Sequence, residues 1–162
     1  AVLLSLDRMF QADFEDGGLD QLMLLPVALE GAVMAKLCAH FVGILFPVLA
    51  TMPLAGLLLN IRPDTVVPML ATLLAGAPAL VMLGAIGAAL AVGVRRAGLL
   101  TVLIVTPLYV PVIVFGAGAL ARSLAAPGTL DVAALGVLGL ISAASIFLAP
   151  PAIAAALRAG LR

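Results

Sequence analysis

Side chains that could do chemistry are few in this chain, and they stand apart from one another. The 162 residues include one histidine, His40, and one cysteine, Cys38, which lie near the start of a long apolar run. A single cysteine excludes an internal disulfide and a metal site built from several cysteines. His40 could ligate a metal centre, but a lone histidine at a helix end more often hydrogen-bonds a neighbour. The apolar runs hold no nucleophile–base pair, so we expect no enzyme.

Phosphate and nucleic-acid binding are also disfavoured. Lys36 is the only lysine, and the residue before it is Ala35, so the G-x-x-x-x-G-K phosphate loop is absent. Eight basic and eight acidic residues give zero net charge, with no basic stripe and interleaved aromatics. If ATP drives this protein, another subunit must bind it.

The polar stretch 7–36 is the most informative part of the chain and holds six of the eight acidic residues. Two adjacent glycines favour a turn, a short helix with apolar residues at i, i+3 and i+4 follows, and a proline ends it. The residues concerned are Gly17, Gly18, Leu19, Leu22, Met23 and Pro26. Such a helix can lie on the membrane surface without a partner, or it can dock into a groove on another protein. The spacing leaves both interpretations open.

The composition requires a lipid environment for the rest of the chain. Hydrophobic residues make up 65% and charged residues 10%, with a mean hydropathy of +1.33. Soluble domains are about 45–50% apolar and about 25% charged. The apolar runs are long and do not alternate, which favours helices over a barrel. The sequence therefore predicts an all-α, polytopic transmembrane helix bundle forming one domain over 1–162.

Four apolar stretches reach the length of about 20 residues that a span requires. They cover about 37–59, 66–94, 99–121 and 132–157, and residues 1–6 are expected to be the end of an upstream span. Pro150 and Pro151 should bend or break the last span. Six basic residues fall in 7–36, 95–98 and 158–162, against Arg62 and Arg122 on the other side. The positive-inside rule then places the first set, and the C-terminus, in the cytoplasm.

Small residues recur four apart within the spans, in a pattern that lets helix backbones approach closely. The pairs are Gly84 with Ala88, Ala89 with Gly93, and Gly139 with Ala143. They fit packing within the chain, and they also fit an interface between two copies.

The stretch from Glu15 to Pro26, followed by Lys36, resembles the signature of ABC-2 type permeases. Within that group the chain is similar to the haem exporter protein B family (CcmB) of bacterial cytochrome c maturation. The matching pieces are Arg8-Met9-Phe10, Gly18 to Pro26, Ala35-Lys36 with Ala39-His40, Gly76-Ala77-Pro78, Val92 to Gly98 and Ala154 to Arg158. Leu25 departs from the Ser or Thr that many ABC-2 permeases carry. The family has about six spans, so the first and most of the second would be missing here.

The resemblance implies a permease subunit in the bacterial inner membrane, present in two copies with two copies of a CcmA-like ATPase. The helix at 19–23 would be the coupling helix, and CcmC-like and CcmE-like proteins would handle haem. Haem would be transported or delivered, and this chain would bind no cofactor itself. The alternative is a scaffold that passes the ATPase's conformational change to haem-handling partners without moving substrate. The chain has no Trp, so the Trp-rich motif of the CcmC-like proteins is absent. His40 is the main candidate if this chain itself ligates haem.

Overall fold

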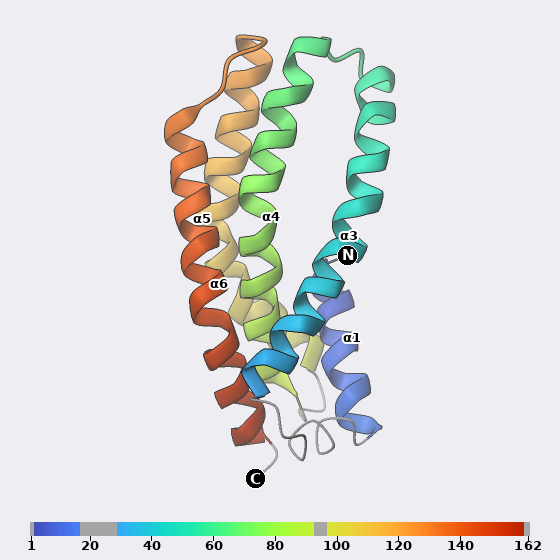
Figure 1. Cartoon of the computed structure of the whole chain (residues 1–162), viewed down its shortest axis with the longest axis vertical. Coiled ribbons are helices and arrows are strands. Elements are labelled where there is room, and N and C mark those ends of the chain that lie inside the picture. The colour runs from blue at the N-terminus through green and yellow to red at the C-terminus, as the bar shows by residue number, and fades with distance from the viewer. Residues whose placement is uncertain (1, 17–28, 93–96, 161–162) are drawn as a thin grey trace.

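The computed structural model describes residues 2–16, 29–92 and 97–160, and every regular element in these ranges is a helix. The helices are α1 (Val2–Glu15), α3 (Leu29–Leu58), α4 (Pro63–Ala91), α5 (Ala97–Ala125) and α6 (Val132–Gly160). Figure 1 shows them as a bundle of long, roughly parallel rods. Four of them, α3 to α6, are long and apolar enough to cross a membrane. The predicted all-α polytopic fold is confirmed.

Each predicted span overlaps one helix, but the helices extend beyond the apolar runs. α3 begins at Leu29 rather than at about residue 37, and α1 continues through Glu15 into the stretch predicted as a loop. The extension of α1 is amphipathic, because Leu6 and Phe10 are buried while Arg8 and Glu15 are exposed. A helix with one buried face persists past the point where hydropathy falls.

Of the two effects expected from the prolines of the last span, a bend or a break, the break does not occur. α6 is continuous from Val132 to Gly160, with Pro150 and Pro151 inside it. Ala149, Ile153 and Ala154, on either side of the pair, are fully buried against the bundle. Packing against neighbouring helices compensates for the hydrogen bonds that are lost at prolines within a membrane helix.

α4 lies at the centre of the bundle and contacts α1, α3, α5 and α6. Its buried face consists largely of alanine and glycine, which allows close approach. Gly87 is the tightest of the described glycines, because an added Cβ there would lie 2.0 Å from Cγ2 of Val105 on α5. Any larger residue at this position requires Val105 or α5 to shift.

Two turns close the end of the bundle that we call the turn end, at the top of Figure 1. Asn60 adopts a positive φ of 52° after α3, and Ile61 N–H donates to Gly56 O at 2.8 Å, which is a Schellman-type helix end. Asp131 caps α6, because its Oδ1 accepts the Ala134 N–H at 3.1 Å. Its other oxygen pairs with Arg122. The opposite end, where α1 ends and α3 begins, we call the loop end.

α3 packs least well of the four long helices. Only 6% of its most apolar stretch is buried, against 28% for α4 and for α6. Near the turn end α3 stands away from the rest of the bundle (Figure 1). Large apolar side chains such as Phe46, Leu54 and Leu57 are exposed along it. This face of α3 is therefore available to lipid or to another helix.

Candidate functional site

The residues predicted to form the coupling helix all lie outside the described part of the chain. They are Gly17, Gly18, Leu19, Leu22, Met23 and Pro26, and the described residues resume at Leu29. The structure does place both flanks of this segment, since α1 ends at Glu15 and α3 starts at Leu29. Both flanks lie at the loop end, together with the C-terminal end of α6 (Figure 1).

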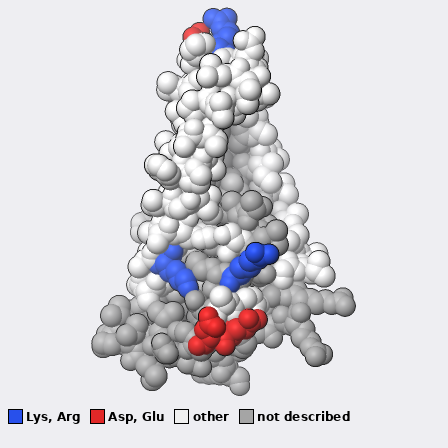
Figure 2. Space-filling view, turned by 90° about the vertical axis from the view of Figure 1, so that its right-hand side faces the viewer, with Lys and Arg blue, Asp and Glu red and all other residues white. Residues whose placement is uncertain are grey.

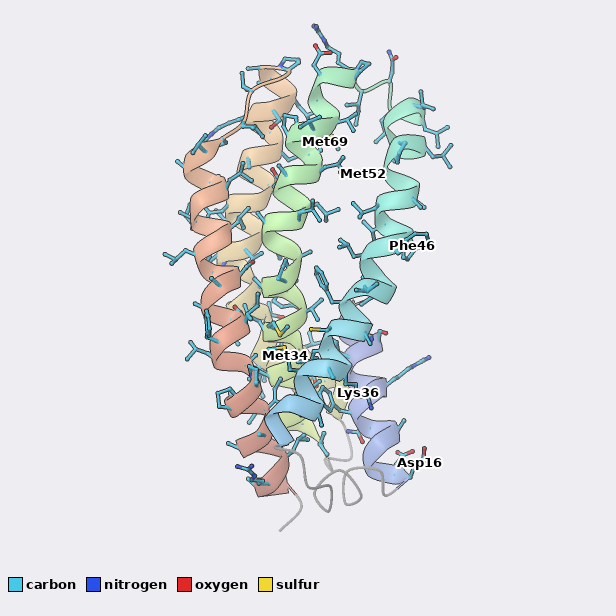
Figure 3. All side chains as sticks on the ribbon, in the orientation of Figure 1. Asp16, Met34, Lys36, Phe46, Met52 and Met69 are labelled. Atoms are coloured by element: carbon cyan, nitrogen blue, oxygen red, sulfur yellow. The ribbon has the colours of Figure 1, made fainter. Side chains whose placement is uncertain are left out.

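Charged side chains gather at the loop end. Figure 2 shows Lys and Arg side chains above Asp and Glu side chains near the lower end of the molecule, with an uncharged surface over most of the height above them. The described acids here with exposed side chains are Glu15 and Asp16, and Arg8 is exposed on the same helix. Lys36 comes from α3, and Figure 3 shows it above Asp16. An uncharged belt between charged ends is the surface that a bilayer requires.

His40 lies on α3 just beyond Lys36, within the helix rather than at its end. Among the described residues, its Nε2 is the one buried side-chain nitrogen or oxygen without a hydrogen-bond partner. The sequence favoured a hydrogen bond to a helix end or a neighbour, and the structure gives this atom none. Buried polar atoms usually have a partner, so this atom of the half-buried His40 is an exception among the described residues. The described residues contain no group of three or more His, Cys, Asp or Glu that could hold a metal ion.

A largely apolar cavity of about 320 Å³ lies toward the turn end, between α3, α4 and α5. A second space of about 110 Å³ adjoins it and shares Leu73, Ala77 and Leu80. We call the two together the α3–α4–α5 groove. Met52 of α3 and Met69 of α4 lie at similar heights on its two sides (Figure 3). Gly76 and Leu80 of α4 and Gly116 of α5 line it between them.

The groove offers almost no polar contact to a ligand. Among the described lining residues only Thr72 has a hydroxyl, and that hydroxyl donates to Pro68 O at 2.9 Å. The hydroxyl of Tyr109 on α5 donates to the carbonyl of Leu80 at 2.5 Å, so it ties α5 to α4 beside the groove. Sites for polar small molecules normally present a few convergent polar groups. This groove instead suits an apolar occupant.

Ser142 on α6 was not singled out from the sequence, yet it bonds the backbone of α4. Its hydroxyl donates to Ala75 O at 2.5 Å and accepts the Ala79 N–H at 3.3 Å. These two backbone groups pair with each other in a regular helix. The nearby Pro78 lacks an N–H and disturbs the ladder there. In the sequence, Pro78 indicates that backbone groups of this helix need hydrogen-bond partners from another helix. It does not show which residue supplies them.

The structure describes two of the three small-residue pairs in full, since Gly93, the partner of Ala89, lies outside the described residues. Gly84 and Ala88 are buried on α4, as is Ala89, which supports packing within the chain for that helix. Gly139 and Ala143 on α6 are exposed, and an added Cβ at Gly139 would meet nothing within 4 Å. The α6 pair therefore makes no contact that accounts for its spacing.

Comparison with known proteins decides the family. The family model described as "CcmB protein" matches residues 1–160. The chain belongs to the CcmB protein family. Among curated relatives, Heme exporter protein B of Paracoccus denitrificans is 51% identical over 160 residues, which is 99% of this chain and 72% of the relative. The Rhodobacter capsulatus protein of that name is 44% identical over 100% of this chain and 73% of the relative.

A relative with somewhat lower sequence identity carries the same name. Heme exporter protein B of Escherichia coli K12 is 42% identical over 161 residues, covering 99% of this chain and 72% of the relative. The family resemblance drawn from the stretch around Gly18 to Pro26 is thus confirmed for essentially the whole chain. In each of these relatives, more than a quarter of the polypeptide lies outside the matched part.

Proposed function

We propose that this chain is the membrane permease subunit of an ABC transporter complex that exports or delivers haem during c-type cytochrome biogenesis. The observation that carries the proposal is the CcmB family match over residues 1–160, together with relatives named Heme exporter protein B. Four helices that can each cross a membrane are the architecture such a subunit needs. The chain is a transporter component rather than an enzyme.

ATP hydrolysis is assigned to a separate, CcmA-like subunit, because the only lysine here cannot belong to a phosphate loop. The segment 17–28 would meet that subunit, with Leu19, Leu22 and Met23 as its apolar contacts and the glycines and Pro26 shaping it. The exposed acids Glu15 and Asp16 at the end of α1 lead directly into this segment. A CcmC-like membrane protein, a CcmE-like chaperone and a second copy of this chain complete the proposed complex.

We place the chain in the bacterial cytoplasmic membrane, with the loop end and the C-terminus in the cytoplasm. The distribution of Lys and Arg supports this orientation, because six of the eight fall in 7–36, 95–98 and 158–162, and the described residues that flank these stretches lie at the loop end. The ATPase works in the cytoplasm, so the proposed coupling segment must lie on that side.

One observation favours a second candidate, in which the chain is a scaffold and moves no haem. Haem carries two propionate carboxylates, yet the described lining of the groove holds no cation to pair with them. In this version the chain transmits the ATPase's conformational change to haem-handling partners. Haem is then delivered or released on those partners.

Copurification tests membership of the ABC complex. The affinity-tagged chain, extracted in mild detergent, should retain an ATPase subunit whose ATP hydrolysis is measurable in the purified material. A chain that purifies in folded form without any ATPase, under conditions that preserve its other membrane partners, would refute both candidates.

A further inference from the structure

The two halves of α3 pack very differently against the rest of the bundle. Toward the loop end, Leu37 is fully buried in a core cluster that also includes residues of α1, α4 and α6. Toward the turn end, Leu54 and Leu57 are exposed and the helix stands away from the bundle (Figure 1). We call residues 29–42 the α3 base and residues 48–58 the α3 arm.

The base and the arm meet at Gly43 and Pro47, where the helix lacks one of its hydrogen bonds. Proline has no N–H, so the carbonyl of Gly43, four residues before Pro47, has no helical donor. An added Cβ at the exposed Gly43 would meet nothing within 4 Å, so the described helices leave this point free to bend. The Thr51 hydroxyl lies 3.0 Å from Pro47 O and 3.1 Å from Val48 O, and such bonds to the preceding turn often bend helices. We therefore expect α3 to bend most easily between its base and its arm.

The arm has empty space on the side that faces α4 and α5. The α3–α4–α5 groove lies there, with its two spaces of about 320 Å³ and 110 Å³, and Met52 of the arm borders it (Figure 3). Protein interiors are otherwise close-packed, with few voids larger than a water molecule. On the opposite wall, Gly116 and Ala117 of α5 are small, and an added Cβ at Gly116 would meet nothing within 4 Å. Small residues of this kind let the backbone of another helix approach closely.

The far end of the arm is tethered to α4 by a short turn. α3 ends at Leu58 and α4 begins at Pro63, so only residues 59–62 connect them. Each residue of an extended chain spans at most about 3.6 Å, so the tip of the arm stays close to the start of α4. That start is itself held in place, because Thr65 and Pro68 are buried. A bend between base and arm is therefore directed toward the groove rather than away from it.

We propose that the α3 arm is a lid, which bends at Gly43 and Pro47 and closes onto α4 and α5, so that Met52 fills the groove against Gly116 and Ala117. The structure shows the arm in its open position. Closing gives the apolar side chains on both walls van der Waals contacts that they lack across the groove. The flexible side chain of methionine can fit an irregular wall. Such a movement does not depend on what the complex transports.

Pulsed electron paramagnetic resonance tests the movement by measuring distances between two spin labels. The sample is the polypeptide as its gene encodes it, with its copurified partners in lipid bilayers, and an excess of copies without labelling sites removes distances between chains. The arm pair joins Leu54→Cys to Leu140→Cys on α6, in a Cys38→Ala background, and both native side chains are exposed. The base pair joins the native, exposed Cys38 to Phe147→Cys on α6 and serves as the control. Each pair is measured without nucleotide, with ATP and with a non-hydrolysable analogue.

The arm pair should show two populations in at least one of these states, with the shorter distance several ångströms below the longer. The base pair should show one population throughout. Pro47→Ala restores the N–H that bonds Gly43 O, so it should reduce the arm pair to one population without changing the base pair. Two arm populations that survive Pro47→Ala would place the bend elsewhere and contradict the hinge.

A second variant tests closure onto the groove without altering the hinge. Ala117→Phe places a ring on the wall opposite Met52, so it should remove the shorter arm distance and keep the longer one. Ala144→Phe is the matched control, because Ala144 is exposed on α6 and does not line the groove. A single arm population in all three nucleotide states, or a shorter distance that survives Ala117→Phe, would overturn the lid. Neither of these outcomes requires Pro47→Ala to insert.

Discussion

Ser142 on α6 accepts a hydrogen bond from the backbone N–H of Ala79 on α4, at 3.3 Å, across the centre of the bundle. The same hydroxyl donates to Ala75 O, so one side chain hydrogen-bonds a backbone group on each side of Pro78. Lipid offers no hydrogen bonds to these groups. The contact between α4 and α6 is therefore more than apolar packing.

We expect Ser142→Ala to destabilise the bundle by about 1 kcal/mol, since hydrogen bonds between membrane helices contribute about 0.6 kcal/mol on average and up to about 1.7 kcal/mol. The measurement is the free energy of unfolding in mixed detergent micelles. Ser145→Ala is the matched control, because the Ser145 hydroxyl bonds only Ile141 O of its own helix at 2.7 Å. An equal or larger loss for Ser145→Ala would show that the bridge to α4 adds no stability.

Gly87→Ala should separate α4 from α5. The added Cβ would lie 2.0 Å from Cγ2 of the fully buried Val105, whose branched side chain has little freedom to rotate. Overpacking of this kind costs about 1–3 kcal/mol. Unfolding measurements should show the loss in Gly87→Ala, its recovery when Val105→Ala is added, and little change in Gly136→Ala, where the added Cβ meets nothing. Failure of Val105→Ala to restore stability would argue against this contact.

These two contacts between helices could not be predicted from the sequence. Runs of apolar residues predict where the spans lie, because each span must satisfy its own backbone in lipid. They do not show which helix faces which, so neither Ser142 opposite Ala79 nor Gly87 opposite Val105 could be named in advance. For the same reason the sequence does not show that α6 continues through Pro150 and Pro151, since that depends on the packing around Ala149 and Ile153.

Some features of the candidate site can likewise be predicted from the sequence, and others cannot. The motif from Glu15 to Pro26 indicates the family from the sequence alone, because the order of its glycines, leucines and proline is specific. The groove could not be read from the sequence, since Met52, Met69 and Gly116 come from three helices and lie far apart in the chain. The place of His40 in the chain predicts a position near the membrane surface, but not the lack of a partner at Nε2.

The proposed orientation can be tested with single cysteines. In a Cys38→Ala background, which removes the exposed native thiol, Ala126→Cys should react with a membrane-impermeant thiol reagent added outside the cell. Ala97→Cys should react only after the membrane is opened. Ala126 is exposed in the α5–α6 turn, and Ala97 begins α5 at the loop end. The reverse labelling pattern would invert the topology.

His40→Ala should leave cytochrome c maturation largely intact. The Nε2 of His40 has no hydrogen-bond partner among the described residues, so the substitution deprives no partner of that bond. The measurement is c-type cytochrome production at normal expression of the variant and with ATPase binding preserved. Abolished maturation with loss of a haem Soret band from the purified permease would make His40 a haem ligand. Abolished maturation with unchanged haem content would assign it to coupling instead.

The proposed coupling segment is tested by Leu22→Asp, which places a charge in an apolar contact with the ATPase. A desolvated, unpaired charge costs several kcal/mol, so the ATPase should no longer copurify. The spans are unchanged, so the permease should still insert. Leu22→Met keeps the side chain apolar and serves as the control. Full retention of the ATPase by Leu22→Asp would remove Leu22 from the interface.

The most direct test of the account is haem movement in sealed vesicles that contain the purified complex. The account predicts ATP-dependent accumulation of haem across the membrane by the native complex and by Leu22→Met. It predicts none by Leu22→Asp or with a non-hydrolysable ATP analogue. Active ATP hydrolysis by an intact complex, without any ATP-dependent haem movement across the bilayer, would contradict the permease function and favour the scaffold.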